Sequence, residues 1–276
     1  MRLFLREVAG LALEEQLARA DQPLAEEMAA DLWSKAKRRA DREPLAYIAG
    51  EAWFYGRSFL VQTGLLVPRS DSEVLIEAAL EELFSLNPEP EAMAAEKKRL
   101  HILDTCCGTG CLGLTLLAEL KERGIPASLH LVDLEELALE TAKANADRLG
   151  LTDLISFEKA DLWPAKDGSE AGVRYDVILS NPPYIPSGDI SGLMPEVGVW
   201  ESKRALDGGI DGLDFYRRLA HGYQDYLTDA GIVILELGAG QDEQAVALFQ
   251  PAEQTWIRLR KDYSGQQRAL ILKGHT

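Results

Sequence analysis

The chain has 276 residues, 46% of them hydrophobic, so it can bury a sizeable core in a large domain with a small one beside it. Its 45 acidic and 29 basic residues give a formal net charge of -16, which would repel a nucleic-acid backbone unless the basic residues were clustered. The one basic run, residues 35–39, lies in a helical pattern and is interpreted as a solvated face. No apolar run approaches the roughly 20 residues that span a bilayer, and charges interrupt the start where a signal peptide needs an apolar core. We therefore expect a cytoplasmic, monomeric protein that binds neither nucleic acid nor membrane.

Residues 1–50 carry apolar side chains at helical spacing, punctuated by prolines, and are expected to form a small helical domain. Residues 51–69 are aromatic and β-branched with glycines at plausible turns, which predicts a β-hairpin connector with its strands between 53 and 68. The main domain is expected over 70–276. It should begin with a helix over 71–86 and a polar loop over 87–98.

Beyond the polar loop, strand and helix patterns alternate. The predicted strands cover 100–104, 128–133, 155–158, 175–180, 232–237, 255–260 and 268–272, and the predicted helices cover 112–123, 137–149, 213–227 and 241–249. This alternation predicts an α/β fold with a mostly parallel seven-stranded sheet and helices on both faces.

The most informative motif is Asn181-Pro182-Pro183-Tyr184, which directly follows a predicted strand and so lies at a strand's carboxyl end. Open α/β sheets place their ligands there. Two prolines fix two φ angles and remove two N–H donors, so the loop is stiff and offers mainly carbonyl acceptors. Such a loop suits a substrate that presents an NH2 group, although a plain polyproline-type turn is the alternative for the tetrapeptide alone.

A second motif is the glycine turn that follows the first predicted strand, where backbone can approach a ligand closely before a helix begins. It lacks the complete glycine pattern of a dinucleotide site, so by itself it is a weak signal. Asp133 ends the next strand, where it can accept hydrogen bonds from both ribose hydroxyls. Asp161 follows the third strand and could accept a hydrogen bond from an adenine amino group. Each aspartate alone could be a loop acid or a helix cap.

Together with Asp104 at the first strand's end, these acids place three carboxylates at three successive strand ends, which favours a bound adenosine. The NH2-directed loop beside them selects S-adenosylmethionine over a nicotinamide or a nucleotide. Cys106, Cys107 and Cys111 could suggest zinc, but no fourth ligand is near in sequence, so we interpret them as reduced, packed residues and expect no metal.

The ensemble resembles the HemK-type protein-glutamine methyltransferases, above all those that act on peptide chain release factors. The matching residues are 44–51, 54–56, 67–69, Glu73, 104–110, Asp133, 181–184, Glu201, 205–216 and 262–268. The resemblance implies a Rossmann-like methyltransferase that uses S-adenosyl-L-methionine, releases S-adenosyl-L-homocysteine, and methylates the Gly-Gly-Gln glutamine of a release factor. It also implies that the helical amino-terminal domain holds the protein substrate.

The resemblance assigns roles to individual residues. It places Cys106, Cys107, Gly108, Thr109 and Gly110 at the methionine end of the cofactor and Asp133 at the ribose. Asp161 and Leu162 would meet the adenine, Asp104 would position the turn or contact the amino acid part, and Asn181 would face both cofactor and substrate. Cysteine at position 106 replaces a usual glycine, which could adopt φ > 0 where cysteine does so only at a cost.

Other residues resemble a sister branch that methylates a glutamine of a large-subunit ribosomal protein, namely 52–54, 66–70 and Cys106. A ribosomal protein is therefore a possible partner. Arg69 and Glu73 are expected either to join the two domains near the active site or to form a plain interdomain ion pair.

The mechanism that follows is one of placement. The Asn181 side-chain carbonyl and the Pro182 backbone carbonyl would accept the two hydrogens of a glutamine amide and aim its lone pair at the methyl group. Pro183 and Tyr184 would complete the substrate site, with the Tyr184 ring walling off water. Two rival hypotheses are a DNA adenine methyltransferase, which the acidic charge disfavours, and a non-catalytic adenosine-binding or ribosome-associated protein.

Overall fold

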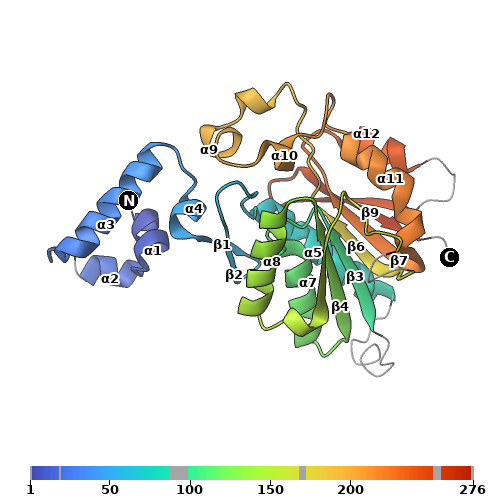
Figure 1. Cartoon of the computed structure of the whole chain (residues 1–276), viewed down its shortest axis with the longest axis horizontal. Coiled ribbons are helices and arrows are strands. Elements are labelled where there is room, and N and C mark those ends of the chain that lie inside the picture. Colours follow the sequence, from blue (N-terminus) through green and yellow to red (C-terminus); the bar gives the residue numbers. More distant parts are fainter. Residues whose placement is uncertain (1, 19, 87–98, 168–171, 251–255, 275–276) are drawn as a thin grey trace.

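The computed structural model describes residues 2–18, 20–86, 99–167, 172–250 and 256–274. The loop expected over 87–98 and the start of the strand expected at 255 lie outside these residues. No helix in the described ranges is long and apolar enough to cross a membrane. The amino-terminal helices stand to one side of the rest of the molecule (Figure 1) and are α1 (Arg2–Ala9), α2 (Leu13–Ala18), α3 (Glu26–Ala40) and α4 (Leu45–Ala49).

The basic run at the end of α3 is only partly solvated, which corrects the sequence interpretation. Arg39 Nη2 and Arg42 Nη2 lie 2.9 and 2.7 Å from the two carboxylate oxygens of Glu196, which belongs to α9 (Pro195–Gly198). The helical segment is thus tied to a part of the chain more than 150 residues away.

The connector is a shorter hairpin than predicted, with β1 (Glu51–Phe54) antiparallel to β2 (Arg57–Leu60). Its two turn residues, Tyr55 and Gly56, have φ of 49° and 73°, which matches a type I′ turn and the twist of a tight hairpin. Asn145 binds the edge of β2 that faces away from β1: Leu60 N donates to Asn145 Oδ1 at 2.7 Å, and Asn145 Nδ2 donates to Leu60 O at 3.1 Å. Residues 61–69 then run without strand structure.

The main sheet has seven strands in the order β5-β4-β3-β6-β7-β9-β8. All neighbours from β5 to β7 are parallel, whereas β9 is antiparallel to both β7 and β8, so the predicted mostly parallel sheet is confirmed. The strands are β3 (Leu100–Thr105), β4 (Ala127–Asp133), β5 (Ile155–Lys159), β6 (Tyr175–Ser180), β7 (Leu227–Glu236), β8 (Ile257–Lys261) and β9 (Gln267–Lys273). The strand order reverses at β3, whose neighbours are β4 and β6, and ligands bind at such a switch point.

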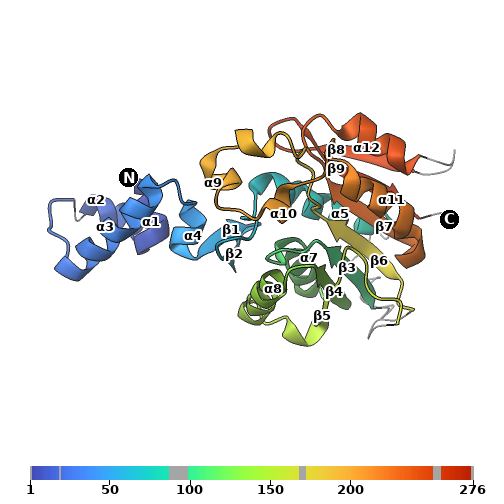
Figure 2. The ribbon, with the colours of Figure 1, turned by 45° about the horizontal axis from the view of Figure 1, so that its top comes forward.

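Helices cover both faces of the sheet (Figures 1 and 2), as predicted. One core layer contains buried residues of α5 (Glu73–Leu86), α7 (Cys111–Glu122) and α8 (Glu136–Arg148), and the other contains those of α11 (Asp214–Tyr226) and α12 (Asp242–Phe249). Short turns of 3-10 helix at Ser70–Ser72, Thr152–Leu154 and Ile190–Gly192 and the short helices α9 and α10 (Lys203–Leu206) were not predicted. The turn at Ile190–Gly192 and the helices α9 and α10 lie between β6 and α11, directly after the Asn-Pro-Pro-Tyr loop. We call residues 185–206 the insertion after β6.

Candidate active site

A pocket opens at the carboxyl ends of the central strands. Its empty volume, including the part open to solvent, is about 1030 Å³. Of the residues predicted from sequence, those lining it are Cys106, Cys107, Gly108, Thr109, Asp133, Asp161, Leu162, Asn181 and Pro183. Asp104, Gly110, Pro182 and Tyr184 are not part of the lining and lie behind it or beside it.

The glycine turn that forms one wall winds through three left-handed residues. Cys106, Gly108 and Gly110 have φ of 58°, 54° and 76°. A side chain on Gly110 would be strained by the left-handed φ and crowded, because its Cβ would lie 3.1 Å from Ala142 Cβ. Cys106 adopts the left-handed conformation that the usual glycine would favour, at a cost of about 1–2 kcal/mol.

The three cysteines all line this wall as free thiols. Burial raises the pKa of Cys106 and of Cys111 to about 12. At neutral pH they stay protonated, which makes them poor nucleophiles and poor metal ligands. The described ranges contain no cluster of acidic, histidine and cysteine side chains that could hold a metal ion.

Asp104 braces the turn from below. Its side chain is fully buried, and Gly113 N donates to its Oδ2 at 2.8 Å, so the carboxylate joins the end of β3 to the first turn of α7. The contact depends on glycine, since a Cβ on Gly113 would lie 2.9 Å from Asp104 Cβ. Burial raises the pKa of Asp104 to about 7. Of the two roles expected from sequence, the geometry supports positioning of the turn.

Asp133 lies at the end of β4 and does line the pocket. Its Oδ2 accepts from Gly108 N and its Oδ1 from Glu135 N, both at 2.9 Å. A carboxylate has about four acceptor positions, so these two bonds leave capacity for two hydroxyl donors. Burial raises the pKa of Asp133.

The far end of the pocket is built by Asp161, Leu162 and a residue missed from sequence, Phe215. Leu162 has φ of 75°, and its carbonyl accepts a hydrogen bond from the Thr105 hydroxyl. Asp161 Oδ1 pairs with Arg218 Nη2 at 2.8 Å, and Arg218 in turn lies over the Phe215 ring, 5.3 Å from its centroid. One arginine thus braces both an acid and a ring that border the same space.

The Asn-Pro-Pro-Tyr loop follows β6 as predicted, and Asn181 faces the pocket. No group in the described residues hydrogen-bonds the Asn181 side-chain amide or the Pro182 carbonyl. Tyr184 is held at both ends: its hydroxyl donates to Glu236 Oε1 at 3.1 Å, and its carbonyl accepts from Gln241 Nε2 at 2.8 Å. The loop therefore presents uncommitted acceptors on a fixed backbone.

A glycine-rich segment backs this loop. Gly208 N donates to Ile185 O at 2.9 Å, and Ser187 N donates to Gly209 O at 2.8 Å. A Cβ on Gly208 would lie 2.8 Å from Tyr184 Cα, and one on Gly212 would lie 2.3 Å from Tyr184 O. Only glycine permits so close an approach to the loop.

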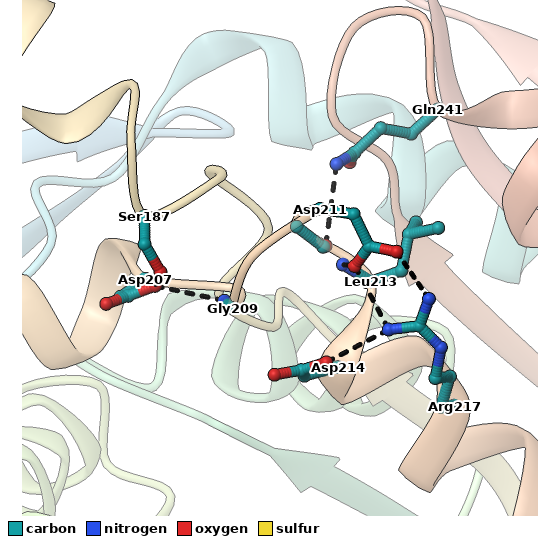
Figure 3. A network of polar contacts seen from close by, with 9 residues as sticks. Ser187, Asp207, Gly209, Asp211, Leu213, Asp214, Arg217 and Gln241 are labelled. Atoms are coloured by element: carbon teal, nitrogen blue, oxygen red, sulfur yellow. Dashed lines mark hydrogen bonds and ion pairs between the residues drawn. The ribbon is translucent and has the colours of Figure 1, made fainter.

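Carboxylates fix the two ends of the glycine-rich segment (Figure 3). Asp207 Oδ1 accepts from Ser187 Oγ at 2.6 Å and from Gly209 N at 3.0 Å. At the other end Arg217 pairs with Asp211 at 2.5 Å and with Asp214 at 2.9 Å. These contacts brace the segment against the loop that it supports.

Of the two alternatives for Arg69 and Glu73, an ion pair between them is not formed. Arg69, which lines the pocket, pairs with buried Glu201 at 2.5 Å, whereas Glu73 Oε1 accepts from Tyr55 N at 2.7 Å. Arg69 thus ties the connector to the insertion after β6, while Glu73 ties the hairpin turn to α5.

Comparison with known proteins places this geometry in a family. The profile described as Methyltransferase small domain matches residues 91–209, and that described as PrmC N-terminal domain matches residues 1–50. A methyltransferase structure from Pyrococcus furiosus is 16% identical, covers 92% of this chain and 100% of its own, and has a TM-score of 0.50, which supports the fold alone.

Two relatives are much closer in sequence. A release factor glutamine methyltransferase of Geobacter sulfurreducens is 38% identical over 229 residues, which is 83% of this chain and 72% of the relative. One of Rhodospirillum rubrum is 36% identical over 273 residues, 99% of this chain and 77% of the relative. The resemblance drawn from the sequence motifs is confirmed, and the chain belongs to the family of release factor glutamine methyltransferases.

Proposed function

We propose that this protein transfers a methyl group from S-adenosyl-L-methionine to the side-chain amide nitrogen of the Gly-Gly-Gln glutamine of a peptide chain release factor. The observation that supports it most is that Asn181, with an uncommitted amide, faces the same pocket as Asp133 and the glycine turn. Family membership supplies the substrate class.

The pocket's residues fit this cofactor. Asp133 keeps acceptor capacity for two ribose hydroxyls, the turn at Gly108 leaves open space where a Cβ would stand, and Phe215 and Leu162 offer apolar surface for a base. When bound, the cofactor supplies a sulfonium-activated methyl group. Asp161 would meet the adenine amino group while Arg218 holds its carboxylate in place.

The chain's own contribution is orientation of a weak nucleophile. The lone pair of a primary amide is delocalised into its carbonyl, so it must be freed and aimed. Asn181 Oδ1 and Pro182 O accept the two amide hydrogens, which favours a pyramidal nitrogen with its lone pair directed at the methyl group. Orientation of this kind can supply up to about 7–11 kcal/mol, and acceptors that face positive charge developing on nitrogen add an electrostatic contribution.

The proton of the N-alkylated amide then leaves to water, so no general base is required. Tyr184 limits water at the loop. Its hydroxyl cannot serve as a base, because burial and the neighbouring Glu236 carboxylate raise the pKa of Tyr184 above its usual value.

We assign substrate holding to the helical residues 1–50, with 51–69 as connector and 70–276 as the catalytic domain. Support comes from the two ion pairs through which Arg39 and Arg42 reach Glu196, since they join the helical part to the insertion that follows the catalytic loop. A release factor would then meet both parts of the chain at once.

The alternative substrate is a glutamine of a ribosomal protein, and it rests on the sequence resemblance of residues 52–54, 66–70 and Cys106 to the sister branch. One experiment separates the two. Purified release factor and ribosomal proteins are incubated with the chain and cofactor, and mass spectrometry locates any added methyl group. Modification of the Gly-Gly-Gln glutamine, absent when that residue is glutamate, supports the proposal. Methylation of ribosomal protein alone would refute it, and methylation of DNA at low salt would favour the adenine hypothesis.

A further inference from the structure

The end of β7 carries a buried acid beside the catalytic loop. Glu236 is 2% exposed, and its Oε1 accepts the hydrogen bond from the Tyr184 hydroxyl. The side chain does not line the pocket, and its contact with the loop is the hydrogen bond from Tyr184. In the sequence it falls within the strand predicted over 232–237.

Burial of a carboxylate is unfavourable unless its surroundings compensate. Burial raises the pKa of Glu236, whereas the nearby Ser72 hydroxyl, the Arg268 guanidinium and the Tyr184 hydroxyl favour its charged form. Arg268 is itself held, with Nε 3.0 Å from Asp262 Oδ2 and Nη1 donating to Leu237 O at 2.9 Å. Tyr184 thus lies beside a buried carboxylate, Glu236, and a guanidinium, Arg268, that is itself held by hydrogen bonds.

The backbone just beyond β7 lies close to the Tyr184 ring, since a Cβ on Gly238 would lie 3.0 Å from Tyr184 Cδ2. Tyr216 closes the layer behind it: its hydroxyl donates to Glu236 O at 2.8 Å and accepts from Gly238 N. The position of the Tyr184 ring and the position of the end of β7 are therefore coupled through Glu236.

We propose that Glu236 is a positioning residue for methyl transfer, which acts by holding the Tyr184 ring and, through it, the adjoining Asn181 and Pro182 acceptors in register with the methyl group. This role rests on the proposed function. Loss of the contact frees the ring and misaligns the acceptors, and a misplacement of about 1 Å can cost about 100-fold in rate. Cofactor affinity should not change, because no Glu236 atom borders the pocket.

The test uses the full-length chain, its release factor substrate and three variants. Glu236→Leu removes the acceptor at similar volume, Glu236→Gln keeps an acceptor oxygen, and Tyr184→Phe removes the donor without altering β7. We expect kcat to fall about 10- to 100-fold for Glu236→Leu and Tyr184→Phe, and to recover to within about fivefold of wild type for Glu236→Gln. The KM for the release factor and the Kd of the cofactor should stay within about twofold.

The double variant Glu236→Leu/Tyr184→Phe provides the decisive comparison. If the two side chains act as one unit, its kcat equals that of the worse single variant, whereas independent roles make the two losses multiply. Multiplied losses, wild-type kcat for Glu236→Leu, or a parallel loss of cofactor binding would each overturn the inference. Wild-type protein is assayed in parallel. If it methylates the release factor, the proposed function stands, and the results for the variants then test only the role of Glu236.

Discussion

Gly212 tests whether the backing of the catalytic loop sets the position of its carbonyls. Its φ is +76°, and a Cβ placed on it would lie 2.3 Å from Tyr184 O and 2.4 Å from Gln241 Nε2. Gly212→Ala therefore combines left-handed strain of about 1–2 kcal/mol, overpacking of about 1–3 kcal/mol and loss of the hydrogen bond from Gln241, about 1 kcal/mol. We expect the free energy of unfolding to fall by about 3–6 kcal/mol and kcat to fall about 100-fold as the loop shifts.

Two other glycines separate these contributions. Gly240 has φ of +77° but nothing within 4 Å of a Cβ, so Gly240→Ala measures left-handed strain alone. Gly188, four residues beyond Tyr184, has neither a positive φ nor a neighbour within 4 Å, and its alanine variant should be neutral. Urea unfolding reports stability, and single-turnover methyl transfer reports the chemical step. Two results would contradict this role of the glycine-rich segment. One is a Gly212→Ala variant that loses no more stability than Gly240→Ala, and the other is a Gly212→Ala variant that is less stable yet fully active when folded.

Three further variants probe other parts of the site. Asn181→Ala should slow methyl transfer about 10²–10³-fold, by analogy with the loss of one oxyanion-hole donor. The Kd of the cofactor, measured by calorimetry, should rise only modestly. Near wild-type turnover would contradict the role of Asn181 as an acceptor. Glu196→Gln removes the carboxylate shared by Arg39 and Arg42 and should raise the KM for the protein substrate at low salt. The difference in KM from wild type should shrink at high salt, because salt screens exposed ion pairs. A KM difference that salt leaves unchanged would argue against the ion pairs. Asp104, with its pKa raised to about 7, binds a proton more tightly in the folded than in the unfolded state, so its favourable contribution is complete below about pH 4 and is lost as the pH rises through 7. Asp104→Asn should therefore flatten the fall in unfolding free energy between about pH 4 and 7, and an unchanged slope would show that Asp104 does not titrate there.

The parts of the fold that could be predicted are those encoded locally. Each central strand is a short apolar run, and acids or the Asn-Pro-Pro-Tyr motif follow its end, so their meeting at one sheet edge required only that the strands be parallel. Prediction failed where distant residues decide the structure. Residues 61–69 form no strand, and the strand before them is bound along its outer edge by Asn145, 85 residues from Leu60.

The same physical reason explains which site residues were missed. Glu236 is an ordinary strand end in sequence, and its importance comes from a tyrosine 52 residues earlier. Gln241 begins a helix pattern, yet it donates to Tyr184 O across 57 residues. Phe215 and Arg218 read as one face of an amphipathic helix. Each of them reaches the site through contacts between elements far apart in the sequence, which no local pattern contains.

Two residues of this pocket carry backbone strain. Cys106 and Leu162 both have left-handed φ angles without being glycine, and both line the pocket. Each should cost about 1–3 kcal/mol, and such strain persists only where surrounding contacts over-determine the backbone. Those contacts are present: Cys107 N donates to Val132 O at 3.2 Å beside one, and the Thr105 hydroxyl binds the carbonyl of the other. Because β3 and β4 already hold these turns in place, a bound cofactor need not order them. The binding free energy it releases remains available for orienting the glutamine amide against Asn181.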